Sequence, residues 1–207
     1  MNENPLLSKE NISKDSSINT GNTKKKTFTR EVIELLIISI VIVVPFRMFV
    51  AQPFIVEGSS MYPTFERGNY LVVDEISWRF SDPKRGDVVV FKYPGDPKKN
   101  FIKRIIGMPG EIVSIDKGNV IITSNEYPKG LEIEESYVKY PKEENMKFTL
   151  GQDEYFVMGD NRAQSADSRI WGAVPAKNII GRPILRLYPP SIMPGELSYF
   201  SNIKAEN

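Results

Sequence analysis

The pattern of hydrophobic and polar positions divides the chain into three parts. Residues 1–30 are rich in Asn, Ser, Lys and Thr and cannot bury enough apolar surface to offset the entropy lost on ordering, so we expect a disordered tail. An apolar run follows from Leu35 to Phe46. From residue 52 to residue 207, short alternating or β-branched runs lie between Gly, Pro and Asp residues, which is typical of an all-β domain.

The apolar run is interpreted as the centre of a membrane helix. Residues 35–46 alone would form about 18 Å of helix, which is too short for a hydrocarbon core of roughly 30 Å. The stretch of 20 residues from 32 to 51 reaches that length, and Glu34 and Arg47 lie near its ends, where long side chains can reach the headgroups. We therefore expect one transmembrane α-helix over residues 31–51, with a buried core helix as the alternative.

Basic residues ahead of the apolar run predict its orientation. Lys24, Lys25, Lys26 and Arg30 precede it, and such charge is retained on the cytoplasmic side of a membrane. We therefore expect the N-terminus in the cytoplasm and residues 52–207 on the other side. A cleaved signal peptide fits less well, because the tail is long and Phe49 stands where a cleavage site needs a small residue.

The region after residue 52 predicts a mainly β fold. Asp116-Lys-Gly118 lies between two candidate strands and indicates a hairpin. Residues 124–147 are rich in Glu, Lys, Tyr and Pro and have weak periodicity, so we interpret them as an insertion or flap. The expected strands are 54–56, 70–76, 87–93, 101–107, 111–115, 119–123, 154–158 and 179–187.

Composition removes most catalytic chemistries. The 207 residues include 27 Lys and Arg against 26 Asp and Glu, and a net charge of +1 provides no basic field for nucleic acid. Histidine and cysteine are both absent. Their absence excludes Ser-His-Asp and thiol catalysis, HExxH zinc sites and Cys-ligated metals. We expect no nucleic-acid partner, no metal and no organic cofactor.

A serine and a lysine remain as candidates for nucleophilic catalysis. Ser60 follows an expected strand and Gly58, on a turn that can present its hydroxyl and its backbone N–H to one point, as an acyl-transfer nucleophile requires. Lys103 lies in an apolar strand, where burial would lower its pKa and make it a general base. Arg104 points to the opposite face and is expected to form an ion pair. The alternatives are an ordinary Ser-rich turn and a solvent-exposed lysine.

A third polar segment, residues 159–169, alternates acidic and basic residues around two serines. Such density of opposite charge suggests a loop held by bidentate Arg–carboxylate pairs. Either Ser165 or Ser168 could orient the lysine amine. A phosphate-binding loop is the weaker alternative, because one glycine with acidic neighbours is a poor anion site.

Three segments follow the apolar run in order: the turn around Ser60, the strand around Lys103, and residues 159–169. Together they resemble the motifs of bacterial type I signal peptidases, which are membrane-anchored Ser-Lys enzymes that remove signal peptides from exported proteins. The resemblance extends from about Leu35 to Leu187. It implies Ser60 as nucleophile, Lys103 as general base and Ser165 as the serine that orients the lysine. It assigns structural roles to Asp160, Arg162, Asp167 and Arg169.

The resemblance also implies a fold and a substrate. The fold is a bent arrangement of antiparallel sheets, and the substrates have small residues at the first and third positions before the cut, as in Ala-x-Ala. Phe54, Val56 and Ile102 are implied as lining residues of the substrate pockets. Gly58 stands where some members have a serine that completes the oxyanion hole, so the hole here is expected to rest on backbone groups.

The implied partners are preprotein signal peptides, the lipid bilayer and, by proximity, the protein-export machinery. The implied location is the bacterial cell membrane, with a single membrane pass. Two alternatives remain: a self-cleaving repressor-type Ser-Lys peptidase, for which the tail is too short to hold a DNA-binding domain, and a membrane-tethered β binding module in which the serine and lysine are incidental.

Overall fold

The computed structural model describes residues 28–45, 51–76 and 80–192, and the chain divides into two compact units, 1–40 and 41–207. Helix α1 extends from Phe28–Pro45. Residues 28–30, expected in the disordered tail, are its first residues, while residues 1–27 of that tail lie outside the described residues.

The predicted transmembrane helix over residues 31–51 is not supported. Within the described residues, no helix combines the length and apolar character needed to cross a membrane. Helix α1 has 18 residues and includes Arg30, Glu31 and Glu34, so its first half is charged. Ala51, the last residue of the predicted helix, already belongs to a strand, and residues 46–50 lie outside the described residues.

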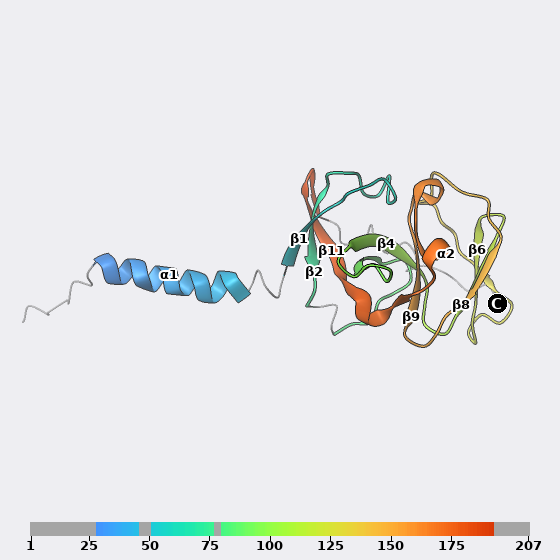
Figure 1. The fold of residues 1–207 in the computed structure, drawn as a ribbon, viewed down its shortest axis with the longest axis horizontal. Helices are drawn as coiled ribbons and strands as arrows, with labels where there is room; N and C mark the ends of the chain where they lie inside the picture. The colour runs from blue at the N-terminus through green and yellow to red at the C-terminus, as the bar shows by residue number, and fades with distance from the viewer. Residues whose placement is uncertain (1–27, 46–50, 77–79, 193–207) are drawn as a thin grey trace, which may run out of the picture. The chain divides into compact units, whose positions relative to one another are not determined.

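Two antiparallel sheets form the second unit (Figure 1). The larger sheet has the order β1-β2-β11-β3-β4-β9-β10, with β12 paired to β11, and the smaller sheet has the order β7-β6-β5-β8. Among the described residues, this unit also contains two short 3₁₀ helices and helix α2. The bounds are β1 Ala51–Ile55, β2 Tyr70–Asp74, β3 Val88–Lys92, β4 Asn100–Gly107, β5 Ile112–Asp116, β6 Asn119–Thr123, β7 Leu131–Glu132, β8 Met146–Thr149, β9 Glu154–Met158, α2 Ser168–Trp171, β10 Val174–Pro175, β11 Ile179–Tyr188 and β12 Pro190–Ile192.

The prediction of a mainly β fold with antiparallel sheets is confirmed. All eight expected strands are present, because each combines alternating or β-branched residues with flanking Gly, Pro or Asp. The expected hairpin is also present: Asp116 pairs with Asn119, and Lys117 and Gly118 both have positive φ, as a type I′ turn requires. Strands β7, β8, β10 and β12 were missed, because segments of two to four residues are too short to show a period.

Strand β4 positions the residues of the site. Strand β3 pairs with residues 100–104 of β4, whereas β9 pairs only with residues 104–107. The first half of β4 therefore has one edge without a strand partner among the described residues. Strand β1 also pairs on one side only, with β2. These two edges border the candidate site described below.

Candidate active site

The turn that holds Ser60 is fixed by apolar side chains on either side of it. Met61 and Phe65 are fully buried and pack with Val56, Leu71 and Val88 in one cluster. The Phe65 N–H donates to the Met61 carbonyl at 2.9 Å, which closes the turn. Ser60 itself is only half-buried, and its backbone N–H donates to no residue that the structure describes. Both its hydroxyl and its N–H are therefore available to a substrate.

Lys103 and Ser60 meet although 43 positions separate them in the sequence. Lys103 Nζ lies 2.6 Å from Ser60 Oγ and 2.9 Å from the Ile102 carbonyl oxygen. The lysine side chain is buried, with 4% of the residue exposed. Removal from water lowers the pKa of Lys103 to about 8, against the opposing effect of the Asp167 and Asp160 carboxylates. The amine is therefore partly neutral near neutral pH.

Arg104 lies on the other face of β4 and forms the ion pair expected from the sequence. Its Nε and Nη2 donate to the two carboxylate oxygens of Asp160 at 2.9 and 2.7 Å, and both side chains are completely buried. Asp160 also accepts a hydrogen bond from Thr64 Oγ1 at 2.5 Å. One carboxylate therefore connects β4 with the far end of the turn that begins at Ser60.

The 159–169 loop is held by bidentate Arg–carboxylate pairs, as predicted, but only one pair is internal to it. Asp167 and Arg169 pair within the loop, at 2.7 Å between Oδ1 and Nε. Burial opposes ionisation of Asp167, but its hydrogen bonds with Arg169 and that residue's charge lower the pKa of Asp167. Asp160 instead pairs with β4, and Arg162 pairs with Glu135, outside the loop. The sequence offered no signal for Glu135, which lies in a weakly periodic run.

Ser165 lies behind the Ser60 turn. A Cβ added to Gly159 would overlap both the Ser165 hydroxyl and the Ser60 carbonyl oxygen, so Gly159 is the residue that allows this close approach. Ser165 is buried, and no hydrogen bond joins it to Lys103 among the described residues. Ser168, the alternative orienting serine, accepts a hydrogen bond from the Val157 N–H at 3.0 Å and so belongs to the β9 framework.

A single cavity of about 760 Å³ contains the predicted catalytic and substrate-binding residues. Phe54 and Val56 come from the β1 side, and Ile102 and Lys103 come from β4. Gln164 and Ala166 of the 159–169 loop line it, whereas the charged residues of the loop do not. Gly58 also lines it and has a φ of +152°, a conformation open to glycine. Sequence reasoning missed several lining residues that carry no distinctive motif: Glu57, Lys98, Lys99, Asn100, Gln164 and Ala166.

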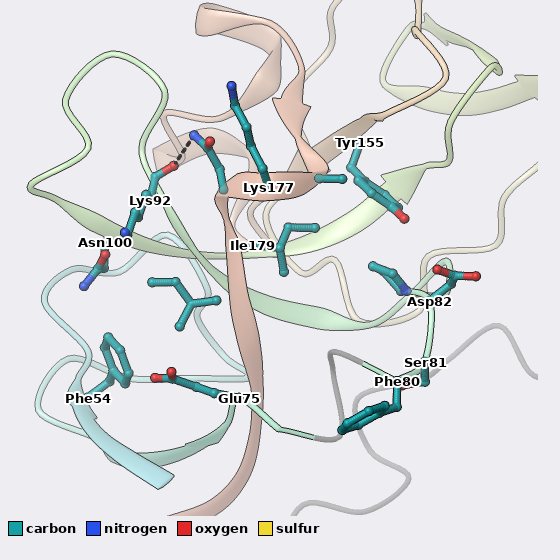
Figure 2. Close-up of a pocket in the computed structure, with 14 residues that line it drawn as sticks. Phe54, Glu75, Phe80, Ser81, Asp82, Lys92, Asn100, Tyr155, Lys177 and Ile179 are labelled. Carbon is teal, nitrogen blue, oxygen red and sulfur yellow. Dashed lines mark hydrogen bonds between the residues drawn. The ribbon is translucent and has the colours of Figure 1, made fainter. Parts of the chain in front are cut away.

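A second cavity, of about 670 Å³, adjoins the first and shares Phe54 and Asn100 with it. Figure 2 shows charged residues around this second cavity, among them Glu75, Asp82 and Lys177. Neither Ser60 nor Lys103 lines it. Of the two cavities, Ser60 and Lys103 therefore line only the first.

A serine hydroxyl in contact with a buried lysine amine is an arrangement that histidine-free Ser-Lys hydrolases use. Comparison with known proteins identifies the family: the description "Signal peptidase, peptidase S26" matches residues 29–188, and the chain belongs to this family. It is 38% identical to "Probable signal peptidase I-1" of Synechocystis sp., over 86% of this chain and 91% of that protein. It is also 38% identical to "Signal peptidase I" of Leptolyngbya laminosa, over 81% of this chain and 83% of that protein.

A solved signal peptidase I from Enterococcus faecalis V583 aligns with a TM-score of 0.43 and 27% identity, over 49% of this chain and 97% of that chain. The resemblance drawn from the sequence motifs is confirmed by the family match and the relatives. The chain is a peptidase of the signal peptidase I type.

Proposed function

We propose that this enzyme removes signal peptides from preproteins by cutting after small residues, with Ser60 as nucleophile and Lys103 as general base. The observation that carries the proposal is the distance of 2.6 Å between Ser60 Oγ and the buried Nζ of Lys103. In a chain without histidine or cysteine, a lysine of lowered pKa is the strongest base available at neutral pH. The family relationship supports the same reaction class.

The proposed reaction begins with the neutral amine of Lys103. It accepts the hydroxyl proton as Ser60 Oγ attacks the carbonyl carbon of the scissile bond. The Ser60 N–H, which has no other partner among the described residues, stabilises the negative oxygen together with the backbone near Gly58. The ammonium then protonates the leaving amine nitrogen, and an acyl-enzyme remains. Lys103 next removes a proton from water, whose oxygen attacks the ester and releases the carboxylate product and Ser60.

The substrate is proposed to bind as an extended strand between the two unpaired edges, β1 and the first half of β4. An added strand gains main-chain hydrogen bonds at such edges, and side-chain pockets provide specificity. Phe54, Val56 and Ile102 surround the groove beside the catalytic pair. Bulky apolar side chains on both borders leave shallow pockets, which fit alanine and exclude larger residues. An Ala-x-Ala pattern before the cut is therefore the proposed specificity.

The 159–169 loop has a supporting role in this proposal. Asp160 and Asp167 lie close enough to Lys103 to oppose the loss of its charge, and their own charges are balanced by Arg104 and Arg169. Ser165 is proposed to limit where the lysine side chain can lie, which its burial next to Gly159 supports.

The place of action is part of the same proposal. Preprotein substrates emerge from the bacterial cell membrane during export, so the catalytic unit is expected to work on the extracytoplasmic side, near the bilayer and the export machinery. Membrane fractionation followed by protease digestion of intact spheroplasts tests this. Recovery of an undigested catalytic unit from the cytosol would contradict it.

The activity is tested with a purified preprotein that carries an Ala-x-Ala site, with the cut located by mass spectrometry. The parent is expected to cut after the second Ala, and Ser60→Ala and Lys103→Ala are expected to lose at least ~1,000-fold in rate. Ser59→Ala and Lys98→Ala are matched controls, because both residues line the same cavity and neither side chain is hydrogen-bonded to Ser60 or Lys103 among the described residues; the Ser59 hydroxyl donates to Gln164 instead. Full turnover without Ser60 or Lys103 would refute the mechanism.

A further inference from the structure

The connection between β7 and β8, residues 133–145, supplies two glutamates to the loop behind the nucleophile. Glu135 pairs with Arg162, and Glu144 pairs with Arg169. Both arginines belong to the 159–169 loop, and both are buried. The connection therefore provides a carboxylate partner for each of the two arginines of the loop.

The pair between Glu135 and Arg162 is nearly inaccessible to water. Arg162 Nη1 and Nη2 donate to the two Glu135 oxygens at 2.6 and 2.5 Å, and the two side chains are 3% and 10% exposed. A buried guanidinium that loses its carboxylate retains the cost of desolvation without the compensating attraction. Arg162 would then move toward water.

Arg162 is also bonded to the backbone that supports the nucleophile. Its Nε donates to the Gly159 carbonyl at 3.0 Å. Gly159 lies against the Ser60 carbonyl with no room for a side chain, and the Asn161 N–H donates to that same carbonyl at 3.0 Å. Movement of Arg162 would therefore release the turn at residues 159–161 that holds the Ser60 backbone in place.

Two further contacts join the connection to this region. The Ala163 N–H donates to the Tyr140 carbonyl at 3.2 Å, and the Tyr140 ring lies 5.9 Å from the ring of Tyr62, two residues after Ser60. The ring of Tyr137 lies 4.1 Å from the Arg104 guanidinium and its hydroxyl donates to Glu135 at 2.8 Å. The connection thus contacts the loop, the Ser60 turn and β4 in addition to its own sheet.

We infer that Glu135 is a positioning residue for Ser60, acting through Arg162 and Gly159; this inference rests on the proposed Ser60 mechanism. Glu135 does not line the cavity that holds Ser60 and Lys103, and neither does any other residue of 133–145. Its loss should therefore change the rate of the chemical step and leave substrate binding nearly unchanged, since small misplacements of reacting groups reduce rate steeply.

The test compares Glu135→Gln with Glu134→Gln, using steady-state cleavage of the Ala-x-Ala preprotein. Glu134 is the neighbouring residue and is exposed, so its variant should behave as the parent. Glu135→Gln is expected to lower kcat by at least ~10-fold with KM within about two-fold, after correction for the folded fraction by near-ultraviolet circular dichroism. A parental kcat in the folded Glu135→Gln variant would overturn the inference.

A double variant separates positioning from stability. Glu135→Leu with Arg162→Met removes both charges together, so it should keep the fold while lacking the Nε–H bond to Gly159. Its kcat is expected to stay at least ~10-fold low, and a parental kcat would refute the role of Arg162. If the parent cleaves and Ser60→Ala does not, the proposed function stands whatever these variants do. If the parent fails to cleave, the proposed function itself fails.

Discussion

The rate of cleavage should depend on the protonation of Lys103. Its pKa is lowered from 10.5 to about 8 because the side chain is buried, and the Asp167 and Asp160 carboxylates oppose this only in part. The lowering corresponds to about 3 kcal/mol between the two protonation states. At pH 7 about a tenth of the enzyme then has a neutral lysine, against less than about one part in a thousand for a lysine in water.

The assay is kcat/KM for an Ala-x-Ala preprotein or peptide, measured from pH 6 to pH 9.5. The value should rise about 90-fold between pH 6 and pH 9, with a slope of one and a midpoint near 8. Because the chain has no histidine and no cysteine, no other side chain with an ordinary pKa between 5 and 9 contributes. Circular dichroism at each pH is the control for unfolding. A level profile, or one that still rises with a slope of tenfold per pH unit between pH 9 and pH 9.5, would refute the assignment of Lys103.

The same pKa predicts how stability depends on pH. Between pH 8 and pH 10.5 the unfolded chain binds more protons at Lys103 than the folded chain, so the free energy of unfolding rises with pH in this window. Below pH 8 both states are protonated and the cost of burying the charge is fully present. Lys103→Met, which is inactive, should therefore be more stable than the parent at pH 7. Urea denaturation at pH 7 and pH 10 measures this, and a larger stabilisation at pH 10 than at pH 7 would contradict it.

Three further substitutions test the framework and the groove. Gly159→Ala should reduce cleavage at least ~100-fold because its methyl group would displace Ser60, and a parental rate would show that the close approach is unnecessary. Arg104→Met should lower the free energy of unfolding by about 3 to 5 kcal/mol, since it leaves the Asp160 charge buried alone; a change below 1 kcal/mol in urea denaturation would contradict this. Val56→Ala should enlarge the pocket, so that the enzyme accepts a larger residue before the cut. The rate of cleavage after Val relative to cleavage after Ala should rise about 10-fold in a peptide-library assay analysed by mass spectrometry. An unchanged ratio would place the pocket elsewhere.

The strands that could be predicted are those whose information is local. Residues 119–123 and 154–158 agree with β6 and β9 at both ends, because alternation and flanking turn residues lie within the segment itself. Strand β8 has four residues, and its partner β5 lies more than 30 positions earlier in the chain. Its pairing is specified by that partner rather than by its own pattern. The helix was also predicted only in part: α1 begins at Phe28, ahead of the expected start at residue 31, and no helix among the described residues has the length and apolar character of a membrane span.

The candidate site likewise contains residues that the local sequence pattern revealed and residues that it did not. Ser60, Lys103 and the charged loop were recognisable because each combines residue types that a plain β framework does not need. The partners of the buried arginines could not be recognised in the sequence. Arg162 pairs with Glu135, 27 positions away, and Arg169 pairs with Glu144, 25 positions away. Both glutamates lie in a polar run that looks like solvated surface. Nothing in a local pattern distinguishes a buried acidic residue from an exposed one.

The sequence by itself determined which chemistry was possible, since the absence of histidine and cysteine leaves lysine as the base for a serine nucleophile. It also determined the antiparallel β character, which follows from side-chain alternation along each strand. Only the tertiary structure decided that the pKa of Lys103 is lowered, as the proposed base requires, because this pKa depends on burial and on the carboxylates near the amine. It likewise decided that residues 133–145 supply the carboxylates that pair with Arg162 and Arg169, because desolvation and ion pairing arise where distant segments meet.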